Sequence, residues 1–272
     1  MSRASAPAKI NLSLVVGPKR DDGKHEVVTV YQRIAIADRL ELEPAPALLV
    51  EGFDADTIVR AALEALAARA GVEPRWHVRI EKRLPIAAGI GGGSSDAATA
   101  LRLANATLPE PLPDDDLLEL AAALGADVPF FLRDGPQLGT GDGSELKPLD
   151  LPQDFWVLLL VPRSIEKPST AAVYADFDQR DGAAGFEERR AAFMSALAAV
   201  RRPRDFAALP PNDLGSSPLA DELRALGAFR ADVTGAGPAV FGLFHHKDRA
   251  KAAQRALKAQ GESWLTAPAW YG

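Results

Sequence analysis

Residues 85–99 read Pro85-Ile-Ala-Ala-Gly-Ile-Gly-Gly-Gly-Ser-Ser-Asp-Ala-Ala-Thr99, and the interpretation of the whole chain depends on this stretch. Glycine reaches backbone angles that a Cβ forbids, so several N–H groups of its glycine-rich part can turn toward one point. We expect Ser94 or Ser95 to cap a helix over about 94–105, whose open N–H groups then make an anion site. The alternative is a tight helix start packed against a sheet.

The glycine-rich loop does not match the common phosphate-binding motifs. A Walker loop ends in Gly-Lys-Ser/Thr, and no lysine precedes Ser94 and Ser95. A dinucleotide-binding loop is expected near the chain start, in a first βαβ unit, whereas 84 residues precede Pro85. The loop therefore predicts phosphate binding of another kind.

Composition bounds the class of protein. The chain has 272 residues, of which 47% are apolar and 25% charged, as in ordinary globular proteins of one large or two moderate domains. The absence of cysteine excludes disulfides, thiolate metal sites and a cysteine nucleophile. The net charge of −6, without a block of lysine or arginine, argues against a nucleic-acid partner. No apolar stretch is long enough for a membrane span or a signal peptide, so we expect a cytoplasmic protein.

Strands and helices are predicted to alternate around the glycine-rich loop. Residues 8–16 alternate like a strand, with Lys9, Asn11 and Ser13 on a polar face that the sequence alone favours as solvated. His25 follows a charged turn and, taken alone, is interpreted as a surface residue. Further strands are expected over 27–37, 39–43 and 76–81, and helices over 57–70 and 114–124, the latter capped by Asp114.

Asp127 stands alone in the apolar segment Gly125–Leu132. A carboxylate buried there without a partner would be costly. It is therefore either a cap for the next helical turn or a working group, and the sequence leaves both interpretations open.

The second half of the chain predicts an α+β sandwich. Residues 136–151 are glycine-rich and turn-like, and 155–161 form a buried strand. The break at Pro152–Asp154 predicts a domain boundary that divides the chain into residues 1–153 and 154–272. Helices are expected over 187–200, 219–226 and 247–260, and a strand after a second tight loop at 234–237.

Three stretches taken together resemble the three motifs of the GHMP kinases, which include galactokinase, homoserine kinase, mevalonate kinase and phosphomevalonate kinase. The stretches are Pro7–Leu12, Pro85–Ala98 and Val233–Phe241. Three more resemble the branch of that superfamily that acts on a CDP-linked methylerythritol: Asp21–Glu26, Gly125–Phe131 and Asn212–Leu214. The resemblance implies an α+β, two-domain fold. Its N-terminal, ATP-binding domain would be ribosomal protein S5 domain 2-like, and its C-terminal domain a ferredoxin-like α/β sandwich.

The resemblance also implies a reaction. It is the ATP-dependent phosphorylation of the 2-hydroxyl of 4-diphosphocytidyl-2-C-methyl-D-erythritol (CDP-methylerythritol) in non-mevalonate isoprenoid synthesis. ATP and Mg²⁺ are the implied cofactors, and a monomer or weak homodimer is expected. Asp127 would take the proton from the hydroxyl as general base. Lys9 would lie beside it, favouring the ionised carboxylate and neutralising developing charge.

Binding residues follow from the same resemblance. It assigns to ATP Lys82, near the adenine, and Pro85, Ala87, Ala88, Gly89, Ile90, Gly91, Gly92, Gly93, Ser94 and Ser95. It assigns to the second substrate Asn11, Lys24, His25, Tyr174, Thr234 and Gly235, with His25 at the cytosine edge and Tyr174 against the base. Ser95 is assigned to the metal, with Ser94 as the alternative.

Two positions depart from the pattern of that branch. Lys24 stands where a tyrosine commonly stacks on cytosine, and Thr57 where an asparagine is usual near adenine. Two alternatives therefore remain: a GHMP kinase acting on another small alcohol, and a non-catalytic nucleotide-binding homologue. His25 with Tyr174 argues against the first alternative, and Lys9 with Asp127 argues against the second.

Overall fold

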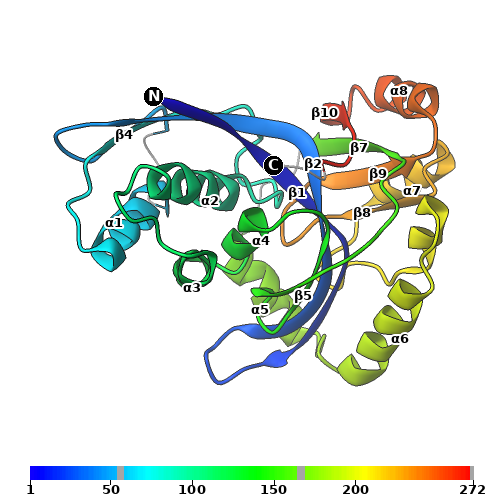
Figure 1. Ribbon diagram of the computed structural model, residues 1–272. Helices are drawn as coiled ribbons and strands as arrows, with labels where there is room; N and C mark the ends of the chain where they lie inside the picture. Colours follow the sequence, from blue (N-terminus) through cyan, green and yellow to red (C-terminus); the bar gives the residue numbers. More distant parts are fainter. Residues whose placement is uncertain (54–57, 164–168, 270–272) are drawn as a thin grey trace.

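The computed structural model describes residues 1–53, 58–163 and 169–269 and shows two β-sheets with helices packed on them (Figure 1). Thr57 lies outside the described residues. In the described part, the first sheet contains β1 (Ser2–Lys19), β2 (His25–Pro44), β3 (Leu49–Glu51), β4 (Trp76–Glu81), β5 (Gln137–Thr140) and β6 (Glu145–Pro148). Its order is β3-β4-β2-β5-β6, and β1 pairs with β2. The predicted α+β class is confirmed.

The second sheet has the order β10-β7-β9-β8. Its strands are β7 (Trp156–Pro162), β8 (Arg230–Val233), β9 (Val240–Phe244) and β10 (Gly261–Thr266). The predicted boundary between residues 153 and 154 falls in the connection between β6 and β7. The division into two domains stays a prediction, because the two sheets share a core.

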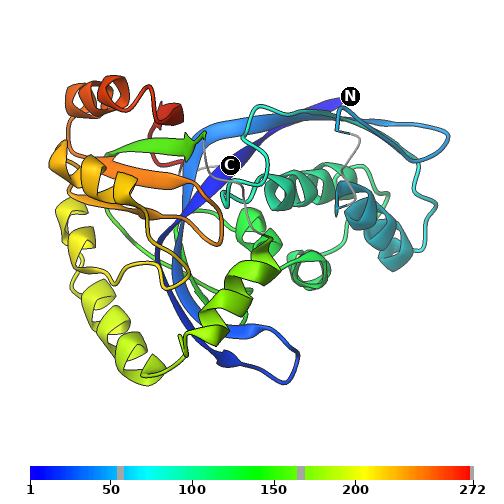
Figure 2. The ribbon, with the colours of Figure 1, turned by 180° about the vertical axis from the view of Figure 1, so that it is seen from behind.

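Helices cover the two sheets separately. On the first sheet pack α1 (Ile58–Ala70), α2 (Gly92–Asn105), α3 (Asp114–Leu124) and α4 (Val128–Leu132). Against the second sheet pack α7 (Pro218–Ala225) and α8 (Lys247–Ala256). Both groups are visible from the front and from behind, together with α5 (Thr170–Gln179), α6 (Phe186–Ala198) and the 3₁₀ helix η1 (Pro203–Ala208) (Figures 1 and 2). None of the described helices is both long and apolar enough to cross a membrane.

The long antiparallel pair β1–β2 is the axis of the first sheet. It runs from the pairing of Ser2 with Leu42 to that of Lys19 with His25, with three shifts of register. The prediction of separate strands over 27–37 and 39–43 is wrong, because one strand passes through Asp38. Asp38 does not sit in a turn. It is fully buried, and its carboxylate accepts the N–H groups of Arg83 and Leu84.

The polar face of β1 is buried, so the expectation of a solvated face is wrong. Lys9, Asn11 and Ser13 are each at most 3% exposed. The C-terminal half covers them: the N–H of Asn11 donates to Thr234 Oγ1, and Ser13 Oγ donates to the carbonyl of Pro210. Alternation along one strand cannot reveal which distant segment covers its polar side.

Helix starts and short strands differ from the sequence prediction in several places. Gly91, with φ of 73°, is the N-cap of α2, so Ser94 and Ser95 lie inside its first turn and do not cap it. Pro113, not Asp114, is the N-cap of α3. The segment expected to be turn-like contains the hairpin β5–β6, and β3, β10 and α5 were not predicted. These strands are short, and β3, β5 and β10 gain pairing partners from segments distant in the sequence.

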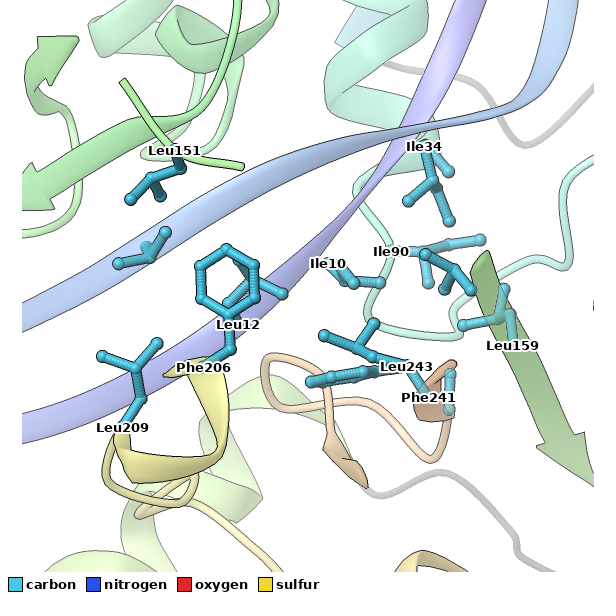
Figure 3. Close-up of a cluster of buried hydrophobic side chains, with 14 of the residues drawn as sticks. Ile10, Leu12, Ile34, Ile90, Leu151, Leu159, Phe206, Leu209, Phe241 and Leu243 are labelled. Atoms are coloured by element: carbon cyan, nitrogen blue, oxygen red, sulfur yellow. The ribbon is translucent and has the colours of Figure 1, made fainter. Parts of the chain in front are cut away.

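One hydrophobic core joins both sheets. Ile10 and Leu12 of β1 share one buried cluster with Leu159 of β7 and Phe241 of β9, and Ile90 of the glycine-rich loop lies beside Ile10 (Figure 3). All five side chains are at most 1% exposed. The core thereby fixes the glycine-rich loop relative to both sheets.

The glycine-rich loop crosses the 234–237 loop with backbone against backbone. A Cβ on Gly89 would lie 2.5 Å from the carbonyl oxygen of Thr234, and one on Gly237 would lie 2.2 Å from that of Ala88. The N–H of Lys9 also donates to the carbonyl of Ile90 at 2.9 Å. Only glycine fits at this crossing. These backbone contacts hold the glycine-rich loop against β1 and against the 234–237 loop of the second sheet.

The crossing predicts that alanine substitution at two glycines with nearly the same φ destabilises the protein by different amounts. Gly89 has φ of +84° and Gly23 has φ of +83°, but no atom would approach a Cβ on Gly23 within 4 Å. Gly23→Ala should lower the free energy of unfolding by about 1–2 kcal/mol, the cost of the left-handed backbone. Gly89→Ala should lower it by about 3–5 kcal/mol, because overpacking adds to that cost. Urea unfolding of both variants gives the comparison, and equal losses would contradict the tight crossing.

Candidate active site

A cavity of about 980 Å³ opens between the glycine-rich loop, the polar face of β1, the start of α4 and helix α5. Most of the predicted site residues line it: Lys9, Asn11, Lys24, His25, Lys82, Pro85, Ala87, Ala88, Gly89, Ile90, Gly91, Gly92, Gly93, Ser94, Asp127, Tyr174 and Gly235. Ser95 and Thr234 are not part of the lining. The fold thus gathers segments from both halves of the sequence around one space.

Lys9 and Asp127 form an ion pair at one end of this cavity. Lys9 Nζ lies 3.1 Å from Asp127 Oδ2, and the Asp127 side chain is 32% exposed toward the cavity while that of Lys9 is 3% exposed. Asp127 occupies the N-cap position of α4 but makes no side-chain capping bond. Of the two interpretations that the sequence left open, capping is therefore excluded, and the carboxylate faces the cavity.

A chain of hydrogen bonds holds the Lys9 ammonium in place. Lys9 Nζ donates to Asn11 Oδ1 at 2.7 Å, and Asn11 Nδ2 donates to Thr29 Oγ1 at 2.8 Å. Thr29 Oγ1 donates in turn to the carbonyl of Ser13 at 2.7 Å. Both ends of the Asn11 amide are thus engaged inside the protein, and its predicted contact with substrate stays a prediction. Sequence analysis missed Thr29, which reads as one more β-branched residue of β2.

Thr234 belongs to the same network. Its Oγ1 accepts the N–H of Asn11 at 2.9 Å, and it is fully buried beneath the cavity wall. Gly235, which follows it, does line the cavity. The 234–237 loop therefore supports β1 through Thr234 and lines the cavity with the small residues Gly235, Ala236 and Gly237.

Tyr31 is the third group at this end, and sequence analysis missed it. Its ring centroid lies 5.4 Å from Lys9 Nζ. Burial, followed by the charge of Asp127, raises the pKa of the phenol well above its usual value. The sequence gave no signal, because Tyr31 looks like any other strand-forming residue of β2.

The glycine-rich loop and α2 form the opposite end of the cavity. The first turn of a helix presents unpaired N–H groups and the positive end of its dipole, which attract anions. Ser94 faces the cavity, whereas Ser95 is fully buried and its Oγ has no hydrogen-bond partner among the described residues. Of the two serines, only Ser94 is therefore in place to meet a ligand.

Lys82 lies beneath the first turn of α2 between two buried carboxylates. Its Nζ donates to Asp96 Oδ2 at 2.8 Å and also to Asp38. Burial pulls the pKa of Lys82 down, but hydrogen bonds to Asp38 and Asp96 outweigh it, so the pKa lies above its usual value. The ammonium is therefore committed to holding this corner of the fold. Sequence analysis missed both aspartates, because a buried carboxylate is recognisable only through its partner.

His25, Tyr174 and Asp178 form a cluster at the far end of β1–β2. The rings of His25 and Tyr174 stack with centroids 4.8 Å apart, and His25 Nε2 lies 2.7 Å from Asp178 Oδ1. His25 is buried, so its interpretation as a surface residue is wrong. Burial, with the charges of Asp127 and Asp142, raises the pKa of Tyr174 to about 12. Sequence analysis missed Asp178 because it missed α5.

Lys24, which stands where the motif predicts a tyrosine, forms an ion pair with Asp142 of the β5–β6 hairpin. Burial raises the pKa of Asp142, but hydrogen bonds from Lys24 and Ser144 outweigh it, and the pKa lies below its usual value. The Lys24 side chain is 51% exposed, so the pair closes over the cavity from its rim. Neither Asp142 nor the hairpin carrying it was predicted.

Known protein families match both halves of the chain. The model of the GHMP kinases N terminal domain matches residues 57–135, and that of the GHMP kinases C terminal matches residues 215–263. The 4-diphosphocytidyl-2-C-methyl-D-erythritol kinase of Thermobifida fusca is 38% identical over 282 residues, covering 94% of this chain and 91% of its own. The enzyme of that name from Geobacter sulfurreducens is 36% identical over 279 residues, which cover 96% of both chains.

Solved structures show the same fold. A crystal structure of 4-(cytidine 5'-diphospho)-2C-methyl-D-erythritol kinase matches 100% of both chains with a TM-score of 0.78 and 33% identity. Mevalonate kinase of Methanococcus jannaschii has a TM-score of 0.74 over 100% of this chain and 98% of its own, but only 13% identity, so it shows the fold alone.

Two sheets joined at a glycine-rich loop, with a lysine–aspartate pair facing a helix N-terminus, define a kinase of the GHMP class. Such a kinase uses ATP. Within that class the chain belongs to the family of the 4-diphosphocytidyl-2-C-methyl-D-erythritol kinases. The resemblance found in the sequence motifs is confirmed.

The buried position of Lys82 predicts a large effect on stability. Lys82→Met leaves Asp38 and Asp96 without their shared cation and should lower the free energy of unfolding by about 3–5 kcal/mol. Arg83→Met is the matched control, since Arg83 pairs with Glu81 at the surface and such pairs contribute about 0–1 kcal/mol. Chemical unfolding at neutral pH measures both. A loss at Lys82 as small as that at Arg83 would contradict the structural role.

Proposed function

We propose that the protein transfers the γ-phosphoryl group of ATP to the 2-hydroxyl of CDP-methylerythritol in non-mevalonate isoprenoid synthesis. One observation carries the mechanism: the Lys9–Asp127 pair faces the same cavity as the glycine-rich loop at the N-terminus of α2. The names of the relatives support the choice of acceptor.

In the proposed mechanism, Asp127 accepts the proton of the acceptor hydroxyl as its oxygen bonds to the γ-phosphorus. The bond between that phosphorus and the β–γ bridging oxygen breaks, and ADP leaves with the electron pair. Lys9, held by Asn11, neutralises charge that develops near the attacking oxygen. Phosphoryl transfer depends mainly on such positioning and charge stabilisation. Backbone N–H groups of the glycine-rich loop would bind the donor phosphates.

Mg²⁺ would enter with ATP and would neutralise part of the negative charge of the phosphates. Among the described residues there is no group of three or more His, Asp or Glu that could hold a metal ion. This fits Mg²⁺, which usually keeps waters and phosphates and takes only one or two protein ligands. We assign the protein contact to Ser94, whose side chain is at the cavity, in place of the buried Ser95.

We propose that the adenine of ATP and the cytosine of the acceptor bind at different ends of the cavity. Lys82, with Phe53 and Ile58 beside it in the lining, marks the side proposed for adenine. His25 and Tyr174 mark the side proposed for cytosine, where Tyr174 supplies a ring for stacking. Lys24 offers no ring, and its ammonium is engaged with Asp142. The base would therefore stack on one aromatic face and not between two.

A substrate panel tests the proposed acceptor. Purified protein with ATP and Mg²⁺ is assayed separately with CDP-methylerythritol, mevalonate, phosphomevalonate, homoserine and galactose, and ADP release is measured. Turnover is expected with CDP-methylerythritol and not with the other four alcohols. Turnover with only one of those four would show a GHMP kinase of different specificity.

Asp127→Asn should lower kcat by about 10²–10⁴-fold, the usual contribution of a positioned general base. The affinity for ATP should stay within a few-fold of the wild type, because the carboxylate lies at the acceptor end of the cavity. Asp150→Asn, an exposed carboxylate on the connection after β6, is the control and should leave kcat unchanged. Steady-state kinetics and nucleotide titration measure both quantities, and a fully active Asp127→Asn enzyme would exclude this base.

A further inference from the structure

Helix α4 carries Asp127 at its start, and two arginines hold its other end. Asp127 is the N-cap residue of α4, a helix of five residues. Arg33 of β2 donates from Nη2 to the carbonyl of Phe131 at 3.3 Å and also to that of Arg133. Arg102 of α2 donates to the same Phe131 carbonyl at 3.1 Å. The last four carbonyls of a helix lack partners within it, so the two guanidinium groups supply donors that the end of α4 needs.

Arg33 is buried, and its ion-pair partner lies at the surface. The arginine is 1% exposed, and among the described residues its Nε has no hydrogen-bond partner. Asp134 Oδ1 lies 3.8 Å from Arg33 Nη1, but the aspartate side chain is 77% exposed. Burial and the charge of Arg102 lower the pKa of Arg33, and the charge of Asp134 only partly offsets them. Such a buried charge often stabilises a protein less than an apolar side chain of similar volume would. Its contacts with α4 therefore account for the arginine better than a gain in stability does.

Phe131 of α4 packs at the start of α2. A Cβ on Gly91, the N-cap residue of α2, would lie 2.9 Å from Phe131 Cζ and 3.1 Å from Lys9 Cγ. The carbonyl of the same phenylalanine accepts the hydrogen bond from Arg33. The guanidinium therefore holds α4 against the glycine-rich loop, and with it Asp127 beside Lys9.

We propose that Arg33 is a positioning residue for phosphoryl transfer: its guanidinium holds the C-terminal end of α4 and thereby keeps the Asp127 carboxylate against Lys9 at the cavity. The role rests on the proposed function, in which Asp127 accepts the proton of the acceptor hydroxyl. From Asp127 to Phe131 the chain rises by about 6 Å along the helix. A tilt of about 10° at the anchored end would move Asp127 by about 1 Å, and such a displacement can cost about 10²-fold in rate.

Arg33→Met tests the proposal, because it keeps an unbranched apolar stem and removes the donors. With CDP-methylerythritol, kcat should fall about 10–100-fold, as expected for a general base displaced by up to about 1 Å. The KM values for ATP and for the acceptor should stay within a few-fold of wild type, because Arg33 does not line the cavity. Steady-state kinetics well below the unfolding temperature of the variant separate this pattern from a loss of folded protein. A wild-type kcat in the folded variant would overturn the proposal.

Arg230→Met is the matched control. Arg230 is 6% exposed, its Nε has no hydrogen-bond partner in the described part of the chain, and it donates to the carbonyls of Phe206 and Leu209. None of these three residues lines the cavity. The variant should unfold at a lower temperature, because Asp232 loses its cation, but kcat per folded molecule should stay within a few-fold of wild type. Equal falls in kcat in this variant and in Arg33→Met would show a general effect of losing a buried guanidinium and would overturn the proposal.

The possible failures are distinguishable. A wild-type enzyme that does not phosphorylate CDP-methylerythritol overturns the proposed function, and amide hydrogen exchange then tests the anchor without turnover. The amides of α4 should exchange faster in Arg33→Met than in the wild type, while those of β7 keep their rates. Unchanged exchange in α4 overturns the anchor.

Should Arg33→Met not fold, Arg33→Lys takes its place. The lysine keeps the buried charge, but a single ammonium does not reproduce the planar fork of donors. A reduced kcat with unchanged KM values supports the proposal, and a wild-type kcat overturns it.

Discussion

A buried ammonium constrains this structure more than any other single group. Lys9 is 3% exposed, and burying an unpaired charge costs several kcal/mol or more, so its partners must be present for the chain to fold. Asn11 comes from the same strand, but Asp127 comes from the start of α4 and Tyr31 from β2. To satisfy one charge, the fold must bring three segments to one point. That point also lies on the cavity, where the Asp127 carboxylate is 32% exposed.

The end of the cavity formed by the glycine-rich loop and α2 is held by different contacts. There the glycine-rich loop is fixed by backbone contacts with the 234–237 loop and by the Asp38–Lys82–Asp96 cluster beneath α2. The crossing brings backbone against backbone, and Asp38 and Asp96 of the cluster are fully buried. The end at His25 and Tyr174 differs, since Lys24 and Asp178 are about half exposed. The tightest contacts are therefore at the Lys9 pair and the glycine-rich loop, and the far end of the cavity keeps exposed side chains that can adjust.

Much of the fold was predictable because local pattern decides it. Regular periodicity gave the helices near α1, α3 and α6 and the strands near β4 and β7. The motifs gave Lys9, the glycine-rich loop and Asp127, because their residue types are tied to a chemistry. Local pattern could not predict which distant segment covers the polar face of a strand. Lys9 reads as solvated until the C-terminal half is placed over β1, and Ser95 reads like Ser94 until the start of α2 is known to be Gly92.

The β5–β6 hairpin shows why the missed elements matter for function. Its sequence reads as turns, yet its glycines enclose the ring of Tyr31 and its Asp142 binds Lys24. Those two contacts lie at different places around the cavity, one beside the Lys9–Asp127 pair and one at the rim. Lys24, where the motif predicts an aromatic residue, pairs with a carboxylate that only this hairpin places opposite it. One short, unpredicted hairpin therefore contacts both the buried end of the cavity and its rim.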